Sequence, residues 1–286
     1  MAKKRSLNAV VTLRNEVSPW LMILQVAPYG WGFPVFRPGQ FAFLGLPGSA
    51  ARCAAAKPDK TDVDPGKLIK RAYSIASSPA QREYLEFYIA LVPGGILTPR
   101  LFNLRVGDRV WLSKTPSGGF TFEDLLVPEV TGLILCTTGS GLAPFISMLG
   151  AHLKCASEQR VVLVHSVRHS WDLGYRSVLM TMQDLRSNFT YLPAISRPED
   201  EFVPWNGHLG RVEDVWKSGA IELLWRKRPT PDDTHVFMCG SPAMSGSMVE
   251  LLKHERFKVD TETELGQIHV EDFWQHAAAQ PSGHSE

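Results

Sequence analysis

The stretch Arg71-Ala72-Tyr73-Ser74-Ile75-Ala76-Ser77 places a guanidinium, an aromatic ring and a hydroxyl within four residues. Side chains of a β-strand alternate between its faces, so Arg71 and Tyr73 are expected on one face and Ser74 on the other. In that arrangement Arg71 can pair with a phosphate, Tyr73 can stack on a flat ring system and Ser74 can hydrogen-bond a ring nitrogen. Taken alone, the stretch favours a plainer interpretation, a strand with a half-buried tyrosine and a surface arginine.

The bulk composition is that of an ordinary soluble globular chain, and 286 residues are enough for two domains. With 30 basic and 29 acidic residues the net charge is +1, so no overall field would hold nucleic acid or an anionic membrane surface. No stretch reaches the ~18 apolar residues of a transmembrane helix. The opening Lys3-Lys4-Arg5 is not followed by the apolar core of a signal peptide. We therefore expect no membrane insertion.

The cysteines Cys53, Cys136, Cys155 and Cys239 show neither Cys-x-x-Cys spacing nor a Cys/His metal pattern. Because the ligands of an iron–sulfur cluster are normally clustered in sequence, neither a cluster nor another metal site is expected. Free thiols are typical of a cytoplasmic protein, which is the expected location.

Residues 1–127 carry short alternating and β-branched runs separated by Gly and Pro. About six such strands without a convincing helix predict a small antiparallel barrel. The expected strands cover residues 9–13, 20–26, 40–46, 71–77, 84–92 and 108–113. Periodicity is lost at about residues 47–70, where Ala, Lys, Asp, Pro and Gly dominate, and we interpret this segment as a long, mobile insertion.

In residues 128–274 strands alternate with helical stretches, which predicts a parallel sheet covered on both faces. The expected strands cover residues 132–137, 161–166, 189–195 and 235–239, and residues 268–273 form a closing strand. The expected helices cover residues 144–153, 175–185, 212–225 and 244–254. Residues 275–286 form a tail of low complexity.

The stretch Thr138-Gly139-Ser140-Gly141-Leu142-Ala143-Pro144 lies where a parallel strand ends and a helix begins. Glycines let the backbone approach a pyrophosphate, and a helix N-terminus offers free N–H groups and a positive dipole. An isolated Gly-x-Gly turn is weak evidence, but the strand before it and the helix after it strengthen the interpretation. Arg168, Arg197 and Arg211 each flank an expected strand end, where open α/β sheets hold ligands; the alternative is solvated surface arginines.

Three more stretches each allow a functional and a structural interpretation. Cys239-Gly240-Ser241-Pro242 is a second strand-to-helix turn, in which a buried cysteine is more often a small apolar residue than a functional thiol. Gly94-Gly95-Ile96-Leu97-Thr98-Pro99 can offer backbone N–H groups to a phosphate, or be a plain hairpin loop. His269-Val270-Glu271-Asp272-Phe273-Trp274 joins a carboxylate to two aromatic rings, although terminal aromatics more often fill a core.

Taken together, these stretches resemble the ferredoxin (flavodoxin)–NADP⁺ reductase family, and most of all its bacterial branch. The sequence RAYSIAS resembles the flavin strand of the family, TGSGLAP its nucleotide loop, CGSPAM its nicotinamide turn and HVEDFW its carboxy-terminal motif. Each motif is moderately specific, and all four occur in the family's order from about Val10 to Trp274. The resemblance implies an FAD-binding β-barrel followed by a Rossmann-like NADP-binding domain.

The resemblance also implies roles for individual residues in holding FAD. Arg71 would contact the pyrophosphate with Ala72 beside it, Tyr73 would lie against the isoalloxazine, and Ser74 would hydrogen-bond flavin N5. Phe273 would shield the other flavin face and Trp274 would stack on adenine. The remaining cradle would comprise Tyr88, Ile89, Ala90, Ile96, Leu97, Thr98 and Thr138.

For NADP(H), the resemblance implies that Gly139, Gly141 and Gly240 form the turns around the nucleotide. The 2′-phosphate would be held by Arg168, Ser196, Arg197 and Arg211. Cys239 would pack near nicotinamide C4, and Glu271 would relay protons towards Ser74. The expected catalytic residues are Ser74, Cys239 and Glu271.

The implied enzyme is a monomer that exchanges electrons between NADPH and a ferredoxin or flavodoxin. The alternatives are the reductase component of an oxygenase and a non-catalytic flavin-binding accessory subunit. Two departures from the family pattern stand out. Phe273 replaces the tyrosine of plant members, and the chain continues for twelve residues after Trp274, where the motif usually ends.

Overall fold

A computed structural model describes residues 7–271, apart from 60–62, 123–124, 126–128, 153–158 and 262. The chain forms two compact units that divide between Gly119 and Phe120, earlier than the expected boundary at residue 127. Phe120 and Phe122 both pack edge-on against Phe237, with ring centroids 5.5 and 5.9 Å away, and this contact ties them to the second unit. Among the described helices, none has the length and apolar character needed to cross a bilayer.

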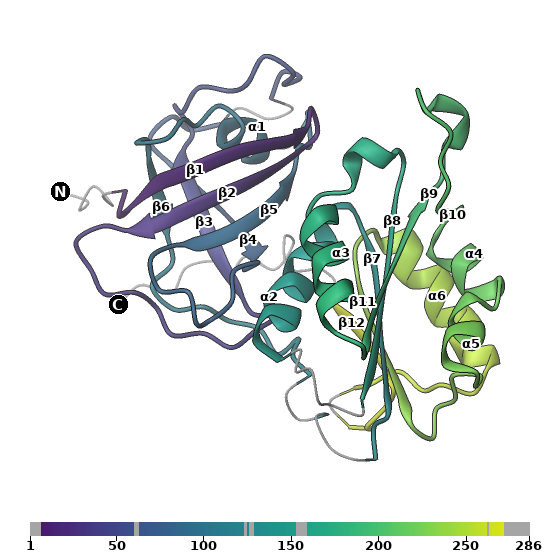
Figure 1. The fold of residues 1–286 in the computed structure, drawn as a ribbon. Helices are drawn as coiled ribbons and strands as arrows, with labels where there is room; N and C mark the ends of the chain where they lie inside the picture. The colour runs from purple at the N-terminus through teal and green to yellow at the C-terminus, as the bar shows by residue number, and fades with distance from the viewer. Residues whose placement is uncertain are drawn as a thin grey trace. The chain divides into compact units, whose positions relative to one another are not determined.

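The first unit is a six-stranded antiparallel barrel (Figure 1). The strand order is β4-β3-β6-β1-β2-β5, and an antiparallel bridge between Ile75 and Phe87 joins the two outer strands. A four-residue helix, α1 (Thr98–Leu101), follows β5. The strands are β1 (Ala9–Ser18), β2 (Leu21–Pro28), β3 (Phe41–Pro47), β4 (Leu68–Ser74), β5 (Leu85–Ala90) and β6 (Arg109–Leu112).

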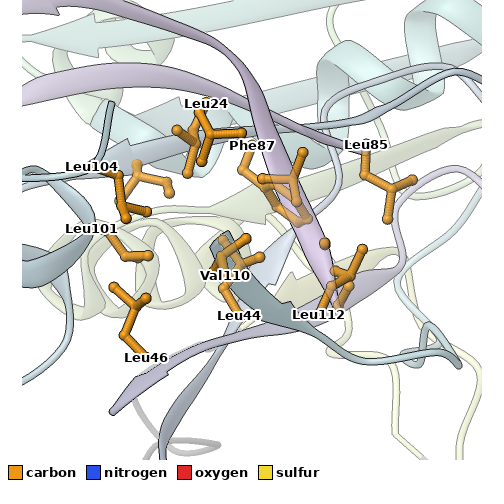
Figure 2. Close-up of a cluster of buried hydrophobic side chains, with 14 of the residues drawn as sticks. Leu24, Leu44, Leu46, Leu85, Phe87, Leu101, Leu104, Val110 and Leu112 are labelled. Atoms are coloured by element: carbon orange, nitrogen blue, oxygen red, sulfur yellow. The ribbon is translucent and has the colours of Figure 1, made fainter. Parts of the chain in front are cut away.

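The barrel core is built by alternate residues of these strands, since every second side chain points inward. In the register of the sheet, Leu44 lies opposite Leu112 and Ala9 lies opposite Val110, and all four are completely buried. Figure 2 shows leucine side chains from several strands and from α1 converging on Phe87 and Val110. Apolar burial of this kind is the main favourable contribution to folding.

The described part of the insertion at residues 47–70 is attached to the barrel at several points. The Gly48 N–H donates to the Lys67 carbonyl at 2.9 Å, and the Lys57 N–H donates to the Pro93 carbonyl at 2.9 Å. Cys53 packs against the barrel core, and β4 already begins at Leu68. These contacts describe an anchored strap, in contrast to the mobile segment that the composition predicted.

The second unit contains a six-stranded parallel sheet in the order β10-β9-β8-β7-β11-β12. The two central strands β7 and β8 are nearly continuous apolar runs, because a strand of a covered parallel sheet is buried on both faces. The strands are β7 (Gly132–Thr138), β8 (Arg160–Val167), β9 (Phe189–Ile195), β10 (His208–Leu209), β11 (Thr234–Cys239) and β12 (Ile268–Glu271).

Helices cover both faces of this sheet (Figure 1). On one face lie α2 (Ala143–His152) and α3 (Arg176–Leu185); on the other lie α4 (Val212–Lys217), α5 (Ala220–Trp225) and α6 (Pro242–His254). The sequence predicted one helix over residues 212–225, which is wrong. Gly219 has φ of +74°, a left-handed conformation that ends one helix and starts the next.

Short elements complete the second unit. The 3₁₀ turns whose bounds the described residues give are η2 (Gly139–Leu142), η3 (Ser170–Asp172) and η4 (Pro198–Asp200). The last strand was predicted to reach residue 273; β12 is described as far as Glu271, and residues 272 and 273 lie outside the described residues.

Candidate functional site

Strand β4 carries the residues that first suggested a cofactor site. It pairs antiparallel with β3, so that Tyr73 lies opposite Ala42 and Ser74 opposite Phe41. Tyr73 packs against the barrel core, and burial raises the pKa of its phenol, although the Arg71 guanidinium opposes that shift. One nitrogen of Arg71 donates to the Lys70 carbonyl at 2.7 Å.

Ser74 has a buried hydroxyl that lacks a hydrogen-bond partner among the described residues. The residue is only 6% exposed, so water does not readily solvate this oxygen. A buried polar group left unpaired costs about 1–3 kcal/mol. By contrast, the hydroxyl of nearby Ser77 accepts a hydrogen bond from the Glu86 N–H at 3.1 Å. The isolated hydroxyl of Ser74 fits a bound ligand that supplies the missing partner.

The structure brings the expected flavin stretches together at the seam between β4 and β5. The Ala76 N–H donates to the Glu86 carbonyl at 2.7 Å, next to the bridge between Ile75 and Phe87. Tyr88 is buried and Ala90 half-buried. The side chain of Ile89 is 1% exposed and belongs to the barrel core, so that only its main chain is available to a cofactor.

The expected phosphate loop ends in α1. Leu97 is buried in the core and Ile96 packs against it. The Thr98 hydroxyl accepts from the Val92 N–H at 3.0 Å and lies 3.3 Å from the Val92 carbonyl. This hydroxyl therefore fixes the loop from within, and the loop's main chain is the part left for a ligand.

In the second unit, the two glycine turns pack backbone against backbone. A Cβ on Gly141 would lie 2.2 Å from the Cys239 carbonyl oxygen, and a Cβ on Gly240 would lie 2.3 Å from Thr138 Oγ1. The same Thr138 oxygen accepts a hydrogen bond from the Ser241 N–H at 3.0 Å. Only glycine permits so close an approach. The turn containing Gly139 is followed by α2, which begins at Ala143 with Pro144 in its first turn.

Two of the residues expected to be catalytic are neighbours in the sheet. Cys239 ends β11 and lies in register with Glu271, which ends β12. Cys239 is completely buried, whereas Glu271 is half-buried. Phe273 and Trp274 lie outside the described residues, so their expected roles stay predictions.

The structure pairs His269, two residues before Glu271, with His235, and the sequence did not predict this pair. His269 Nε2 is 2.9 Å from His235 Nδ1, and His269 Nδ1 is 3.3 Å from an Asp260 carboxylate oxygen. Burial lowers the pKa of His269 to about 4, so this ring is neutral at pH 7. The pairing depends on a register that links β11 to β12, which the sequence alone does not specify.

Two of the predicted arginines lie together at the carboxyl edge of the sheet. Arg168 follows β8 and Arg197 follows β9, and the Arg197 N–H donates to the Arg168 carbonyl at 3.0 Å. Both are exposed, and neither guanidinium has a hydrogen bond or ion pair among the described residues. Two neighbouring cations without counter-charges favour a bound anion. The Ser196 hydroxyl lies 3.3 Å from the Val167 carbonyl.

Arg211 joins the same edge through its backbone, because the preceding Gly210 N–H donates to the Ile195 carbonyl at 2.8 Å. The residue lines a groove of about 680 Å³ between α4 and α6, together with Glu213, Lys217 and His254.

Comparison with known proteins agrees with these two units. An oxidoreductase FAD-binding domain matches residues 58–122, and an oxidoreductase NAD-binding domain matches residues 135–250. A ferredoxin–NADP reductase of Pseudomonas aeruginosa is 33% identical over 218 residues, covering 73% of this chain and 75% of the relative. A flavodoxin/ferredoxin–NADP reductase of Buchnera aphidicola is 30% identical over 211 residues, covering 73% and 82%.

The chain belongs to the ferredoxin (flavodoxin)–NADP reductase family. The crystal structure of a ferredoxin–NADP⁺ reductase from Neisseria gonorrhoeae with bound FAD and NADP has the same fold, with a TM-score of 0.76. The two chains are 23% identical, and the match covers 93% of this chain and 98% of the other. The predicted family, two-domain fold and oxidoreductase class are confirmed. The roles of single residues stay predictions.

Proposed function

We propose that this protein is an FAD-dependent reductase that exchanges electrons between NADPH and a one-electron carrier, ferredoxin or flavodoxin. The observation that carries the proposal is the buried hydroxyl of Ser74, which has no hydrogen-bond partner in the described part of the chain and lies on the strand that resembles the flavin strand of the family. Bound FAD supplies the capacity to accept a hydride and to release the two electrons singly.

The first unit, taken as residues 1–127, holds FAD. Arg71 pairs with a phosphate, which its fork of donors suits, and Tyr73 offers its ring to the flat part of the cofactor. Ser74 donates its hydroxyl proton to a ring nitrogen and gains the partner that it lacks. The main chain around Ile89 and the loop at Ile96–Thr98 complete the cradle.

The second unit, taken as residues 128–274, holds NADP(H). The turn at Gly139 and Gly141 and the start of α2 offer main-chain N–H groups to the pyrophosphate. Arg168 and Arg197 bind the 2′-phosphate, with Ser196 and Arg211 beside them. Cys239 gives the nicotinamide a small, water-excluding neighbour, and Glu271 next to it relays protons towards Ser74.

We further propose a cytoplasmic monomer. In the part of the chain that the structure describes, Cys53, Cys136 and Cys239 are free thiols, as is usual in a reducing compartment. Gel filtration with light scattering tests the monomer, and a dimer mass would contradict it.

Two measurements on purified protein test the function. Acid extraction followed by chromatography should release FAD, and NADPH should drive the reduction of ferricyanide. Cytochrome c should then be reduced only when ferredoxin or flavodoxin is added as the carrier. Flavin without ferricyanide reduction would mean an accessory subunit. Ferricyanide reduction with no response to either carrier would favour an oxygenase reductase.

A further inference from the structure

Arg100 is a buried arginine in α1 that connects the strap to the phosphate loop. Its side chain is 4% exposed. It donates to the Gly48 carbonyl from Nε at 3.2 Å and from Nη2 at 2.8 Å, and to the Ile96 carbonyl from Nη1 at 2.5 Å. A buried guanidinium is costly unless its donors are used, and here they join two separate segments.

Arg52, in the strap, reaches the same loop from the other side. Its Nη2 lies 3.2 Å from the Pro93 carbonyl and 3.3 Å from the Gly95 carbonyl. Because Arg100 bonds the Ile96 carbonyl, the two arginines together hold three carbonyls within residues 93–96, those of Pro93, Gly95 and Ile96. The Lys57 N–H adds a main-chain bond to Pro93.

Asp59 supplies the counter-charge for both arginines. One carboxylate oxygen lies 3.0 Å from Arg100 Nη2, and the other contacts Arg52 Nη1. The hydrogen bond from Arg100 is the largest cause that lowers the pKa of Asp59, so the carboxylate is charged at neutral pH. Without it, two partly or fully buried guanidiniums would lie near each other uncompensated, which is strongly unfavourable.

We propose that Arg52, Asp59 and Arg100 form a clamp that positions the loop at residues 93–98 for FAD and thereby sets the affinity for FAD. The inference rests on the proposed function. The loop contains Gly94 and Gly95, and glycine loses more conformational freedom on ordering than any other residue. The clamp fixes the loop's carbonyls before the cofactor arrives, so that less ordering is left to the binding step. The three side chains are positioning residues.

The test compares apoproteins that differ at the clamp. Asp59→Ala should raise the dissociation constant for FAD roughly tenfold, because preorganisation is lost. Asp59→Glu, which keeps the charge, should restore most of the affinity. The matched control is Asp64→Ala, since Asp64 lies in the same strap and, among the residues that the structure describes, its carboxylate accepts a bond from the Gly66 N–H at 2.8 Å and contacts neither arginine. Flavin fluorescence quenching gives the dissociation constants, and thermal melting of each apoprotein reports its folding.

An Asp59→Ala protein that melts like wild type and binds FAD within twofold of wild type would overturn the clamp. Equal loss of affinity in Asp59→Ala and Asp64→Ala would also overturn it, because the strap as a whole would then be responsible. Should Asp59→Ala fail to fold, Arg52→Met keeps the question open to measurement, since it removes the ion pair of Arg52 with Asp59 and the bonds to Pro93 and Gly95 but leaves the pair of Asp59 with Arg100 in place. A wild-type protein that binds no FAD would instead refute the proposed function.

Discussion

Replacing Ser74 by alanine should change the apoprotein and the FAD complex in opposite directions. In the apoprotein the Ser74 hydroxyl is buried without a partner among the described residues. Removing it relieves about 1–3 kcal/mol of unpaired burial. The void left by one oxygen atom costs ~1 kcal/mol in return. The net result is a stabilisation of about 1 kcal/mol, which corresponds to a rise in melting temperature of roughly 2–4 °C.

With FAD bound, the same substitution removes a hydrogen bond, whose net value is about 1 kcal/mol. Because the apoprotein gains about 1 kcal/mol while the complex loses about 1 kcal/mol, FAD binding weakens by about 2 kcal/mol, or roughly thirtyfold, and FAD should be reduced more slowly with NADPH. Calorimetry of the apoprotein measures the first effect, flavin titration the second and stopped-flow absorbance the third.

The control is Ser77→Ala, because the Ser77 hydroxyl is buried to a similar degree but accepts the Glu86 N–H. Its removal deletes this hydrogen bond and should destabilise the apoprotein by about 1 kcal/mol. If Ser74→Ala destabilises the apoprotein as much as Ser77→Ala, the Ser74 hydroxyl has a partner in the free protein and the reasoning fails.

Three further substitutions test the second unit. Arg197→Ala should raise the KM for NADPH about tenfold and leave the KM for NADH unchanged, because it removes one exposed charge-assisted hydrogen bond, near the lower end of ~1.5–3 kcal/mol. The charge-matched control is Arg228→Ala, which removes an arginine paired with Glu255. Equal losses with both nucleotides would contradict the assignment. Gly141→Ala forces a 2.2 Å contact with a backbone carbonyl and should abolish nucleotide binding, whereas Gly246→Ala in α6, with open space around it, should be neutral or stabilising by up to about 1 kcal/mol. Burial lowers the pKa of His165 to about 3 in the folded state. In the unfolded chain the same imidazole is protonated near pH 6.5. Stability should therefore fall as pH drops from 6.5 towards 3, and urea unfolding of His165→Phe should show a shallower slope over that range.

The fold could be predicted because its periodicities are strong. The continuous apolar runs of β7 and β8 predict strands that are buried on both faces. The alternating runs before residue 113 predict a sheet with one buried face. The errors lie where the signal is short. Strand β10 has two residues and no pattern of its own, and the helix break at Gly219 depends on a single dihedral angle.

The site was predictable only where a local motif carries it. The two glycine turns and the β4 stretch are contiguous in sequence, so their chemistry can be deduced from neighbouring residue types. The clamp is different, because Arg52 and Asp59 meet Arg100 across more than 40 positions of the chain. No periodicity or spacing links these residues, and a composition rich in Ala, Pro and Lys suggested a loose segment instead.

The contact between Gly141 and Cys239 makes the separation of the two turns a property of the main chain. At this contact the backbone of one turn meets the backbone of the other, so there is no side chain to exchange for a longer or shorter one. If these turns hold the two ends of one dinucleotide, the distance between the two binding points is set by the backbone, and a point mutation cannot adjust it. A change in nucleotide preference would then have to come from the carboxyl edge of the sheet, through Arg168 and Arg197. The span from phosphate to nicotinamide would be inherited with the fold.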